Sequence, residues 1–265
     1  MRVVAMDKEK YRQYNYKKQK EGIFIKEAPD NFKLEDTTLW SFPERGSWAT
    51  HSGKYRGNWS PYVPRNLILQ YSKKNAWILD QFLGSGTTLV EAKLLCRNAI
   101  GVDINPEAIK LSNTNLSFIC QETPKIYTRE GNAKKLSFIK DCSIDLVCTH
   151  PPYANIIQYS HDLKEDISHL CYEEFLSVLE SVASESYRVL KKKGICAFMI
   201  GDIRRKGYVL PLGMNSMQKF VDVGFKLKEI VIKEQHNCRS ADYWNGRERK
   251  FLLLAHEYIF VLEKC

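Results

Sequence analysis

The sequence predicts an α/β fold with an open, mostly parallel sheet. From residue 66 onward, short apolar runs typical of buried strands alternate with segments of helical pattern. Two of those runs end in an aspartate, Asp80 and Asp103, and a third is followed by a pair of prolines. Ligands of open sheets bind at the carboxyl ends of the strands, so a site is expected at these positions.

The first part of the chain does not share this pattern. Residues 1–60 are expected to form a polar N-terminal arm followed by an aromatic and basic loop, and residues 61–265 the α/β domain. Residues 36–66 combine Gly, Ser and Pro with many aromatic side chains, which is typical of ordered loop. The interleaved cations and aromatics suit contacts with phosphates and bases. Packing on the core as a lid is an equally good interpretation.

Each element of the predicted domain follows from its local pattern. Apolar runs predict strands, and amphipathic stretches predict helices. Pro106 suits the first turn of a helix, and Gly224 suits the residue after a helix end. The predicted strands are 76–80, 98–104, 144–150, 194–202, 225–235 and 256–264. One predicted helix ends near residue 72, and the others span 87–96, 106–119, 173–190 and 214–224.

Composition narrows the class of partner. The 40 Lys and Arg against 31 Asp and Glu give a formal charge of +9, which favours a polyanion such as nucleic acid. A basic protein that binds no polyanion can have the same balance of charged residues, so the charge alone does not identify the partner. No apolar run is long enough to cross a membrane, and the N-terminal residues lack the apolar core of a signal peptide, so a cytoplasmic protein is expected. The 8 cysteines are scattered without zinc-ligand spacing, so no metal site is expected.

The first chemical motif is the segment 80–88 (DQFLGSGTT), which follows one predicted strand and opens a helix. Gly84 and Gly86 allow a ligand to approach the backbone closely, and no Gly-Lys-Ser/Thr follows as in a phosphate-binding P-loop. Asp103 ends the next strand, where an acid can accept both hydroxyls of a ribose, while Asp80 suits the ammonium of an amino acid. This combination describes a site for S-adenosylmethionine. A purely structural strand–turn–helix is the alternative.

The second motif is the segment 149–153 (THPPY), at the end of a predicted strand. Pro151 and Pro152 stop the strand and fix the chain. An aromatic amino group is a poor nucleophile because its lone pair is delocalised, and acceptors for both its hydrogens return the lone pair to nitrogen. The Pro151 carbonyl and the His150 side chain are candidate acceptors, and Tyr153 is a candidate to stack on a base flipped out of a duplex. A plain Pro-Pro turn is the alternative.

With these motifs the chain resembles the amino-methyltransferases of DNA, which make N6-methyladenine and N4-methylcytosine. Segment 80–88 resembles the family's S-adenosylmethionine motif, and 150–153 (HPPY) resembles its catalytic (D/N/S)-P-P-(Y/F/W) tetrad. Segments 59–64, 188–202 and 256–264 are also similar, and the motif order resembles the gamma arrangement. The resemblance implies a Rossmann-like, S-adenosylmethionine-dependent methyltransferase fold, with a mostly parallel seven-stranded sheet and an antiparallel C-terminal strand.

The resemblance also implies roles for individual residues. DNA is the implied substrate, S-adenosylmethionine is the implied methyl donor, and a cognate restriction enzyme is a conceivable partner. The implied catalytic residues are His150, Pro151, Pro152 and Tyr153. The implied cofactor-binding residues are Asp80, Phe82, Gly84, Ser85, Gly86, Thr87, Asp103 and Asn132.

Two features depart from the family pattern. His150 stands where the family usually has Asp, Asn or Ser, which leaves the choice between adenine and cytosine open. The late segment available for target recognition, about residues 235–250, is short, so the N-terminal arm or a second subunit could contribute. Glu257 is expected only to help terminate and pair a strand. The candidate nucleic-acid contacts are Arg204, Arg205, Arg239, Trp244, Arg247 and Arg249.

Other functions are compatible with the same fold. RNA guanine-N2 and protein glutamine methyltransferases resemble the chain in the glycine turn, but they usually carry Asp-Pro-Pro-Tyr-Gly or Asn-Pro-Pro-Tyr, and here Ala154 follows Tyr153. A non-catalytic nucleic-acid-binding relative is a third alternative, against which the intact glycines and both acids argue. A C5-cytosine methyltransferase is disfavoured because no Pro-Cys pair offers its nucleophile.

Overall fold

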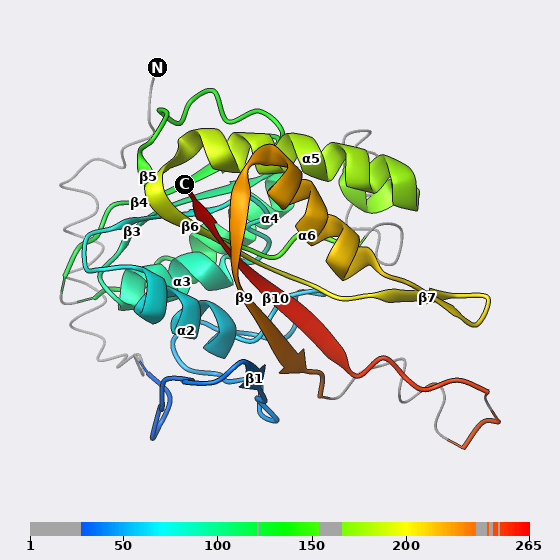
Figure 1. The fold of residues 1–265 in the computed structure, drawn as a ribbon. Coiled ribbons are helices and arrows are strands. Elements are labelled where there is room, and N and C mark those ends of the chain that lie inside the picture. Colours follow the sequence, from blue (N-terminus) through cyan, green and yellow to red (C-terminus); the bar gives the residue numbers. More distant parts are fainter. Residues whose placement is uncertain (1–27, 121, 154–165, 237–242, 244–245, 249) are drawn as a thin grey trace.

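The computed structural model describes residues 28–120, 122–153, 166–236, 243, 246–248 and 250–265. A single large sheet with helices on both faces forms the body, and a small hairpin projects from it (Figure 1). The strands are β1 (Leu39–Trp40), β2 (Trp77–Asp80), β3 (Asn98–Asp103), β4 (Ile126–Glu130), β5 (Ile144–Thr149), β6 (Leu190–Ile200), β7 (Ile203–Arg205), β8 (Tyr208–Leu210), β9 (Phe225–Glu234) and β10 (His256–Lys264).

The large sheet has the order β1-β9-β10-β6-β5-β2-β3-β4. Strands β6, β5, β2, β3 and β4 run parallel to one another. Strand β10 runs antiparallel to both β6 and β9. This confirms the predicted mostly parallel sheet with an antiparallel C-terminal strand. The two-residue β1 pairs with β9 and adds an eighth strand to the seven that were expected.

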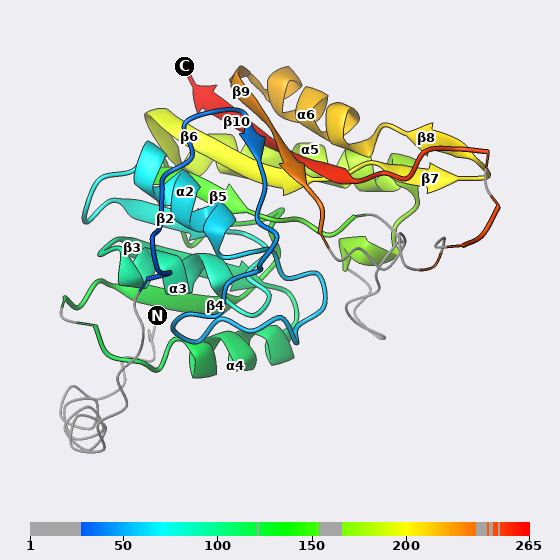
Figure 2. The same ribbon diagram turned by 90° about the horizontal axis from the view of Figure 1, so that it is seen from below.

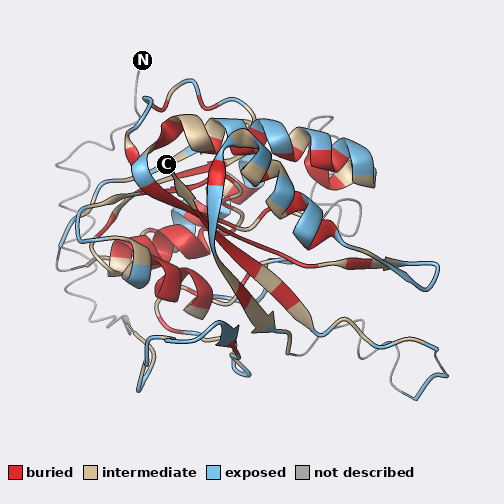
Figure 3. Cartoon of the chain, viewed as in Figure 1, coloured by how far each residue is buried: buried red, intermediate tan, exposed pale blue. Residues whose placement is uncertain are grey.

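Two layers of helices bury the two faces of the sheet (Figure 2). One core cluster contains buried residues of α5 (Tyr172–Val189) and α6 (Leu212–Val223). The other contains residues of α2 (Tyr62–Tyr71) and α3 (Thr87–Leu94), with α4 (Pro106–Asn115) packed beside them. Figure 3 shows the consequence, because the sheet is largely buried while α5 and α6 expose their outer faces.

The aromatic segment before α2 is packed on the domain, which is the lid-like alternative of the two considered. Trp40, Trp48 and Trp59 are all at most 5% exposed. The carboxylate of Glu91 on α3 holds this segment, because it accepts hydrogen bonds from Trp48 Nε1 at 2.7 Å and pairs with His51 Nε2 at 2.7 Å. These buried tryptophans are therefore core residues in this conformation.

Element bounds differ from the predicted ones by a few residues at several ends, and three differences are larger. The helix predicted to reach residue 119 ends at Asn115. Strand β4 was not predicted because its sequence, IYTRE, is half exposed at the sheet edge and lacks an apolar run. The basic run after β6 forms the β7–β8 hairpin, where Lys206 and Gly207 adopt φ values of 50° and 86°. Positive φ at both central residues is the requirement of a tight two-residue hairpin turn.

Candidate active site

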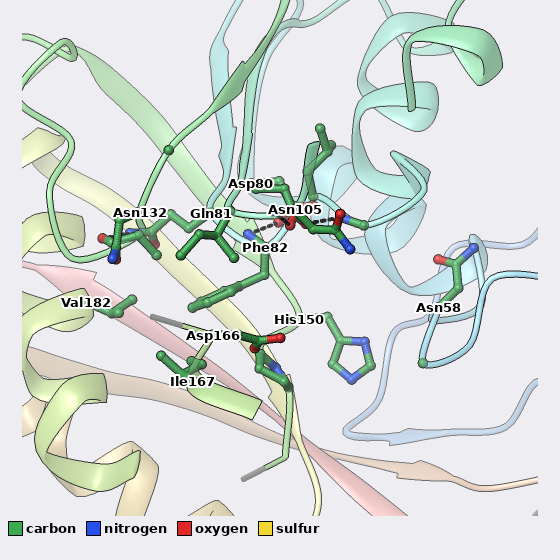
Figure 4. Close-up of a pocket in the computed structure, with 18 of the residues that line it drawn as sticks. Asn58, Asp80, Gln81, Phe82, Asn105, Asn132, His150, Asp166, Ile167 and Val182 are labelled. Carbon is green, nitrogen blue, oxygen red and sulfur yellow. Dashed lines mark hydrogen bonds between the residues drawn. The ribbon is translucent and has the colours of Figure 1, made fainter. Parts of the chain in front are cut away.

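The carboxyl ends of β2, β3 and β5 open onto one cavity (Figure 4). Its volume is about 840 Å³ including its open mouth. The lining comes from the aromatic segment, the ends of β2 and β3, the loop after β4, the tetrad, Asp166 and Ile167, and Val182 of α5. The predicted cofactor motif and the predicted tetrad therefore share a cavity.

The turn after β2 is shaped by its glycines. Gly84 and Gly86 have φ values of 51° and 87°, a backbone conformation that L side chains rarely adopt. A Cβ on Gly84 would lie 3.1 Å from the Tyr55 ring, and one on Gly86 would lie 3.0 Å from Ser112 Cβ. The first glycine therefore allows the aromatic segment to approach the cavity, whereas the second packs against α4.

Asp103 lies at the cavity with its carboxylate oriented by backbone donors. Gly84 N donates to Oδ2 at 2.8 Å, and Asn105 N donates to Oδ1 at 2.9 Å. Burial raises the pKa of Asp103, with a further increase from the charge of Asp166, although the backbone hydrogen bonds act in the opposite direction. A ligand with hydroxyl donors would relieve this unfavourable desolvation.

Asp80 lies beneath the turn and is 2% exposed. Its carboxylate accepts hydrogen bonds from Thr88 Oγ1 at 2.5 Å, from Thr149 Oγ1 at 2.7 Å and from Phe82 N at 3.1 Å. Burial raises the pKa of Asp80 to about 6, although these hydrogen bonds favour the ionised form. Asp80 therefore joins the turn, α3 and the end of β5 as well as lining the cavity.

The tetrad forms the opposite wall of the cavity through His150 and Pro152. The His150 ring stacks on Trp59 with centroids 5.4 Å apart, and its Nε2 lies 3.0 Å from the Tyr153 hydroxyl. Burial lowers the pKa of His150 to about 4, while the charge of Glu257 and a hydrogen bond with the Gly57 backbone act to raise it. The imidazole is therefore neutral at pH 7.

The Tyr153 hydroxyl donates to Glu257 Oε1 at 2.6 Å, and Glu257 Oε2 is 3.0 Å from Lys233 Nζ. Glu257 was expected only to help terminate and pair a strand, and its contact with the tetrad was missed. The strand pattern carried a signal for it, because residue 257 falls in register with the buried Ile259 and Val261 of β10. An acid at a buried strand position needs a partner.

The remaining predicted cofactor residues divide into two groups. Phe82 and Asn132 line the cavity. Ser85 and Thr87 instead hold Asn58 of the aromatic segment, through bonds of 2.7 Å from Asn58 Nδ2 to Ser85 Oγ and 2.5 Å from Thr87 Oγ1 to Asn58 Oδ1. The sequence prediction missed the lining residues that lie outside recognisable motifs, which include Tyr55, Asn58, Trp59, Asp166 and Ile167.

Three of the predicted nucleic-acid contacts lie in the described part of the chain. Arg204 donates to the carbonyls of Gly207 at 2.7 Å and Leu252 at 3.0 Å, so it braces the β7–β8 hairpin against the chain before β10. Arg205 is exposed, and exposed Arg247 lies 4.1 Å from the centroid of the Tyr243 ring. The other three, Arg239, Trp244 and Arg249, lie outside the described residues.

The described residues contain no group of three or more His, Cys, Asp or Glu side chains that could hold a metal ion. Among the helices that the structure describes, none combines the length and apolar character needed to cross a membrane.

Comparison with solved structures shows the fold. A SAM-dependent methyltransferase from Methanosarcina mazei superposes with a TM-score of 0.53 at 18% identity, over 75% of this chain and 96% of that chain. TrmN from Thermus thermophilus superposes with a TM-score of 0.53 at 18% identity, over 79% of this chain and 50% of that chain. The chain therefore has the fold of the SAM-dependent methyltransferases.

Curated relatives match parts of the chain. The type II methyltransferase M2.LlaDCHI of Lactococcus lactis subsp. cremoris is 35% identical over 112 residues, which are 42% of this chain and 38% of the relative. The orphan methyltransferase M.BamHII of Bacillus amyloliquefaciens is 29% identical over 126 residues, which are 48% of this chain and 40% of the relative. The aligned regions therefore span less than half the length of these relatives.

Family models cover more of the sequence. Residues 68–194 match the RMKL-like methyltransferase domain. The DNA methylase model matches residues 3–114 and 144–265, which is most of the 265-residue chain. The chain belongs to the DNA methylase family.

Proposed function

We propose that the chain methylates an exocyclic amino group of a DNA base, adenine N6 or cytosine N4, with S-adenosylmethionine as methyl donor. The observation that carries the proposal is the shared cavity, which is lined by Gly84 and Asp103 of the cofactor motif and by His150 and Pro152 of the tetrad. Methyl transfer needs donor and acceptor atoms about 3–3.5 Å apart, and one cavity for both ligands permits that approach.

The residues of the cavity fit S-adenosylmethionine by their chemistry. Asp103 offers a carboxylate to the ribose hydroxyls, and the buried carboxylate of Asp80 offers a negative charge to the amino-acid ammonium. Phe82 and Ile167 offer apolar surface to the adenine, and Asn132 offers an amide to its edge. When bound, this donor supplies an electrophilic methyl group on a positively charged sulfur.

The tetrad's part is to hold and activate the amino group. The Pro151 carbonyl and the His150 ring are the proposed acceptors for its two hydrogens, which would return the lone pair to nitrogen. A neutral imidazole can accept at one nitrogen, and burial keeps His150 neutral by lowering its pKa to about 4. The Tyr153 ring is proposed to stack on the target base, with its hydroxyl anchored at Glu257.

The proposed DNA contacts lie beyond the same edge of the sheet as the cavity. The β7–β8 hairpin follows the carboxyl end of β6, and the segment before β10 projects beside it (Figure 1, Figure 2). Arg205 and Arg247 are exposed there, and so are the large side chains of Tyr208 and Leu252, at 78% and 86%. Cations for phosphates and apolar tips for bases are the combination that a DNA-binding surface uses.

The direct test is transfer of labelled methyl groups from S-adenosylmethionine to duplex DNA, single-stranded DNA and transfer RNA. We expect label in DNA, and base analysis of the product then distinguishes N6-methyladenine from N4-methylcytosine. Label confined to RNA would instead support a guanine-N2 methyltransferase, which is the alternative left open by the sequence. No transfer to any nucleic acid would contradict both.

A cognate restriction enzyme is also proposed as a partner, because two of the curated relatives are type II methyltransferases. One relative, M.BamHII, is named an orphan methyltransferase. Protection of methylated DNA from digestion by a nuclease encoded beside this protein is the corresponding measurement.

A further inference from the structure

A buried ion pair lies directly behind the tetrad. Glu257 of β10 and Lys233 of β9 face each other across the antiparallel pair, and their side chains are 10% and 13% exposed. Lys233 Nζ lies 3.0 Å from Glu257 Oε2. Burying two charges is costly and by itself adds little to stability, so such a pair invites a search for another role.

The second carboxylate oxygen of Glu257 points at the tetrad. Tyr153 donates its hydroxyl hydrogen to Glu257 Oε1 at 2.6 Å. Burial acts to raise the pKa of Glu257, but the charge of Lys233 and the hydrogen bonds from Tyr153 and Lys233 outweigh it, so the pKa lies below its usual value. Glu257 is therefore ionised at pH 7, which makes it a strong acceptor for the tyrosine hydrogen.

The Tyr153 ring also packs into a niche at the end of β6. Gly201 lies against it, because a Cβ built there would be 3.3 Å from Tyr153 Cε2 and 3.4 Å from Glu257 Cγ. The ring is thus held both by packing beside Gly201 and by its hydroxyl. Its hydroxyl oxygen lies 3.0 Å from His150 Nε2, so the contact continues to the ring that lines the cavity.

His150 lies at the other end of these contacts. Its Nε2 is 3.0 Å from the Tyr153 oxygen, whose hydrogen goes to Glu257 Oε1. The acceptor at position 257 therefore determines how the tyrosine hydroxyl is presented to the His150 ring.

From this geometry we infer that Glu257, with Lys233 as its counter-ion, is a positioning residue for the tetrad. It fixes the Tyr153 ring by its hydroxyl and orients the tyrosine oxygen that faces His150. This inference rests on the proposed function for its catalytic consequence, but the contacts themselves can be tested without activity. Glu263 is the matched control, because it is a glutamate of the same strand that pairs with Lys193 and Lys228, away from the tetrad.

The first measurement is the ¹⁵N spectrum of the histidine side chains in wild type, Glu257→Ala and Glu263→Ala. The protein has 6 histidines, and the signals of His150 are identified by their loss in His150→Ala. We expect Glu257→Ala to change the His150 shifts, because the hydroxyl that faces Nε2 loses its acceptor, and Glu263→Ala to leave them unchanged. Identical His150 shifts in wild type and Glu257→Ala would overturn the inference even if methyl transfer is never detected.

The second measurement is a double-mutant cycle of Glu257→Ala and Tyr153→Phe, with kcat and the affinity for S-adenosylhomocysteine as readouts. Each single variant should lower kcat on the order of 10- to 100-fold, as expected for misplaced reacting groups, with the affinity unchanged. The double variant should be no worse than the poorer single one, because both remove the same contact. Multiplying losses, or a loss in Glu263→Ala of the same size, would contradict the positioning role while leaving the methyltransferase proposal intact.

Glu257→Ala leaves Lys233 buried without its partner, so it risks loss of folding. The variant Glu257→Gln with Lys233→Met removes both charges and keeps an amide oxygen that can accept from Tyr153. We expect this variant to fold and to recover most of the kcat lost in Glu257→Ala. A kcat as low as that of Glu257→Ala, in a folded protein, would show that the acceptor at position 257 is not what matters.

Discussion

The Thr149 hydroxyl donates a hydrogen bond of 2.7 Å to the Asp80 carboxylate. The two residues end the neighbouring parallel strands β5 and β2, one just before the tetrad and the other just before the glycine turn. This bond links the two motifs across a sequence separation of 69 residues. Loss of this hydrogen bond should therefore affect the cofactor site as well as the tetrad.

The first prediction concerns the pH dependence of cofactor binding. Burial raises the pKa of Asp80 to about 6, so the carboxylate loses its charge as the pH falls through 6. If Asp80 holds the ligand ammonium, the affinity for S-adenosylhomocysteine should fall about tenfold between pH 7 and pH 5, following the ionised fraction. Calorimetry across this range measures it, and a flat profile would remove Asp80 from the ammonium site.

The variant Thr149→Val tests whether Asp80 sets the midpoint of this profile. The change removes a hydrogen bond that favours the ionised form of Asp80, so the midpoint of the affinity profile should move to higher pH. Thr128→Val is the control, because the hydroxyl of Thr128 donates to Asn113 in an exposed contact on β4. A midpoint that shifts equally in both variants would point to a general loss of stability.

The second prediction is that Asp103→Ala loses cofactor affinity without unfolding. Each hydrogen bond to a charged group is worth about 1.5–3 kcal/mol, so two lost ribose contacts predict at least a hundredfold weaker binding of S-adenosylhomocysteine. The fold should remain because Asp103 lies at a strand end that opens onto the cavity. Glu130→Ala is the control, because Glu130 is an exposed acid that lies opposite Asp103 on the neighbouring strand β4. This variant should bind S-adenosylhomocysteine normally.

The third prediction concerns the packed aromatic segment. Glu91 is fully buried, accepts from Trp48, pairs with His51 and lies 2.8 Å from Arg65 NH1. Glu91→Ala leaves the buried Arg65 charge uncompensated, which typically costs about 3–5 kcal/mol, or about 6–20 °C in melting temperature. Glu107 is exposed, so Glu107→Ala should change the melting temperature little. Equal melting temperatures for both variants would show that Glu91 does not anchor the segment.

The fold and the site were predictable to different degrees, for physical reasons. Asp80 and Asp103 were predictable because each ends an apolar run, and strand ends define the ligand edge of an open sheet. Tyr55 and Trp59 were not, because they belong to an irregular segment whose position depends on a tertiary anchor, the buried Glu91. Sequence patterns report local periodicity and carry little information about such long-range polar contacts.

His150 illustrates the same limit. Its place in the tetrad was predictable, but a free imidazole titrates near about 6.5, and this value was the natural expectation. The structure stacks the ring on Trp59 and encloses it, which lowers its pKa to about 4. Only the three-dimensional surroundings could have given that shift.

The fourth prediction concerns the salt dependence of DNA binding. Each phosphate contact contributes about −0.9 to the slope of log K against log salt, so Arg205→Ala and Arg247→Ala should each make the slope shallower by about 0.9. Lys74→Ala is the control, because Lys74 pairs with Glu122 near the amino end of β2, on the opposite edge of the sheet. Slopes that are equal in all three variants would place the DNA elsewhere on the surface.

The last prediction concerns turnover and His150. If this ring accepts a hydrogen of the target amine, only its neutral form is active, and protonation abolishes the acceptor. Because burial lowers the pKa of His150 to about 4, kcat at saturating cofactor and DNA should stay nearly constant from pH 8 down to pH 5. An unshifted imidazole would be almost fully protonated at pH 5, so an acidic limb centred near about 6.5 would contradict the buried ring.

Variants of His150 test whether its ring takes part in catalysis. His150→Ala should lower kcat far more than it lowers the affinity for S-adenosylhomocysteine, because the cofactor motif is untouched. His150→Asp restores a carboxylate acceptor but brings a second negative charge toward Glu257 and loses the stacking on Trp59, so it should recover only part of the rate. If His150→Ala instead works as well as wild type, with the same pH profile, then the Pro151 carbonyl acts without His150. That outcome would leave the family assignment in place, since it depends on residues 3–114 and 144–265 together and not on one side chain.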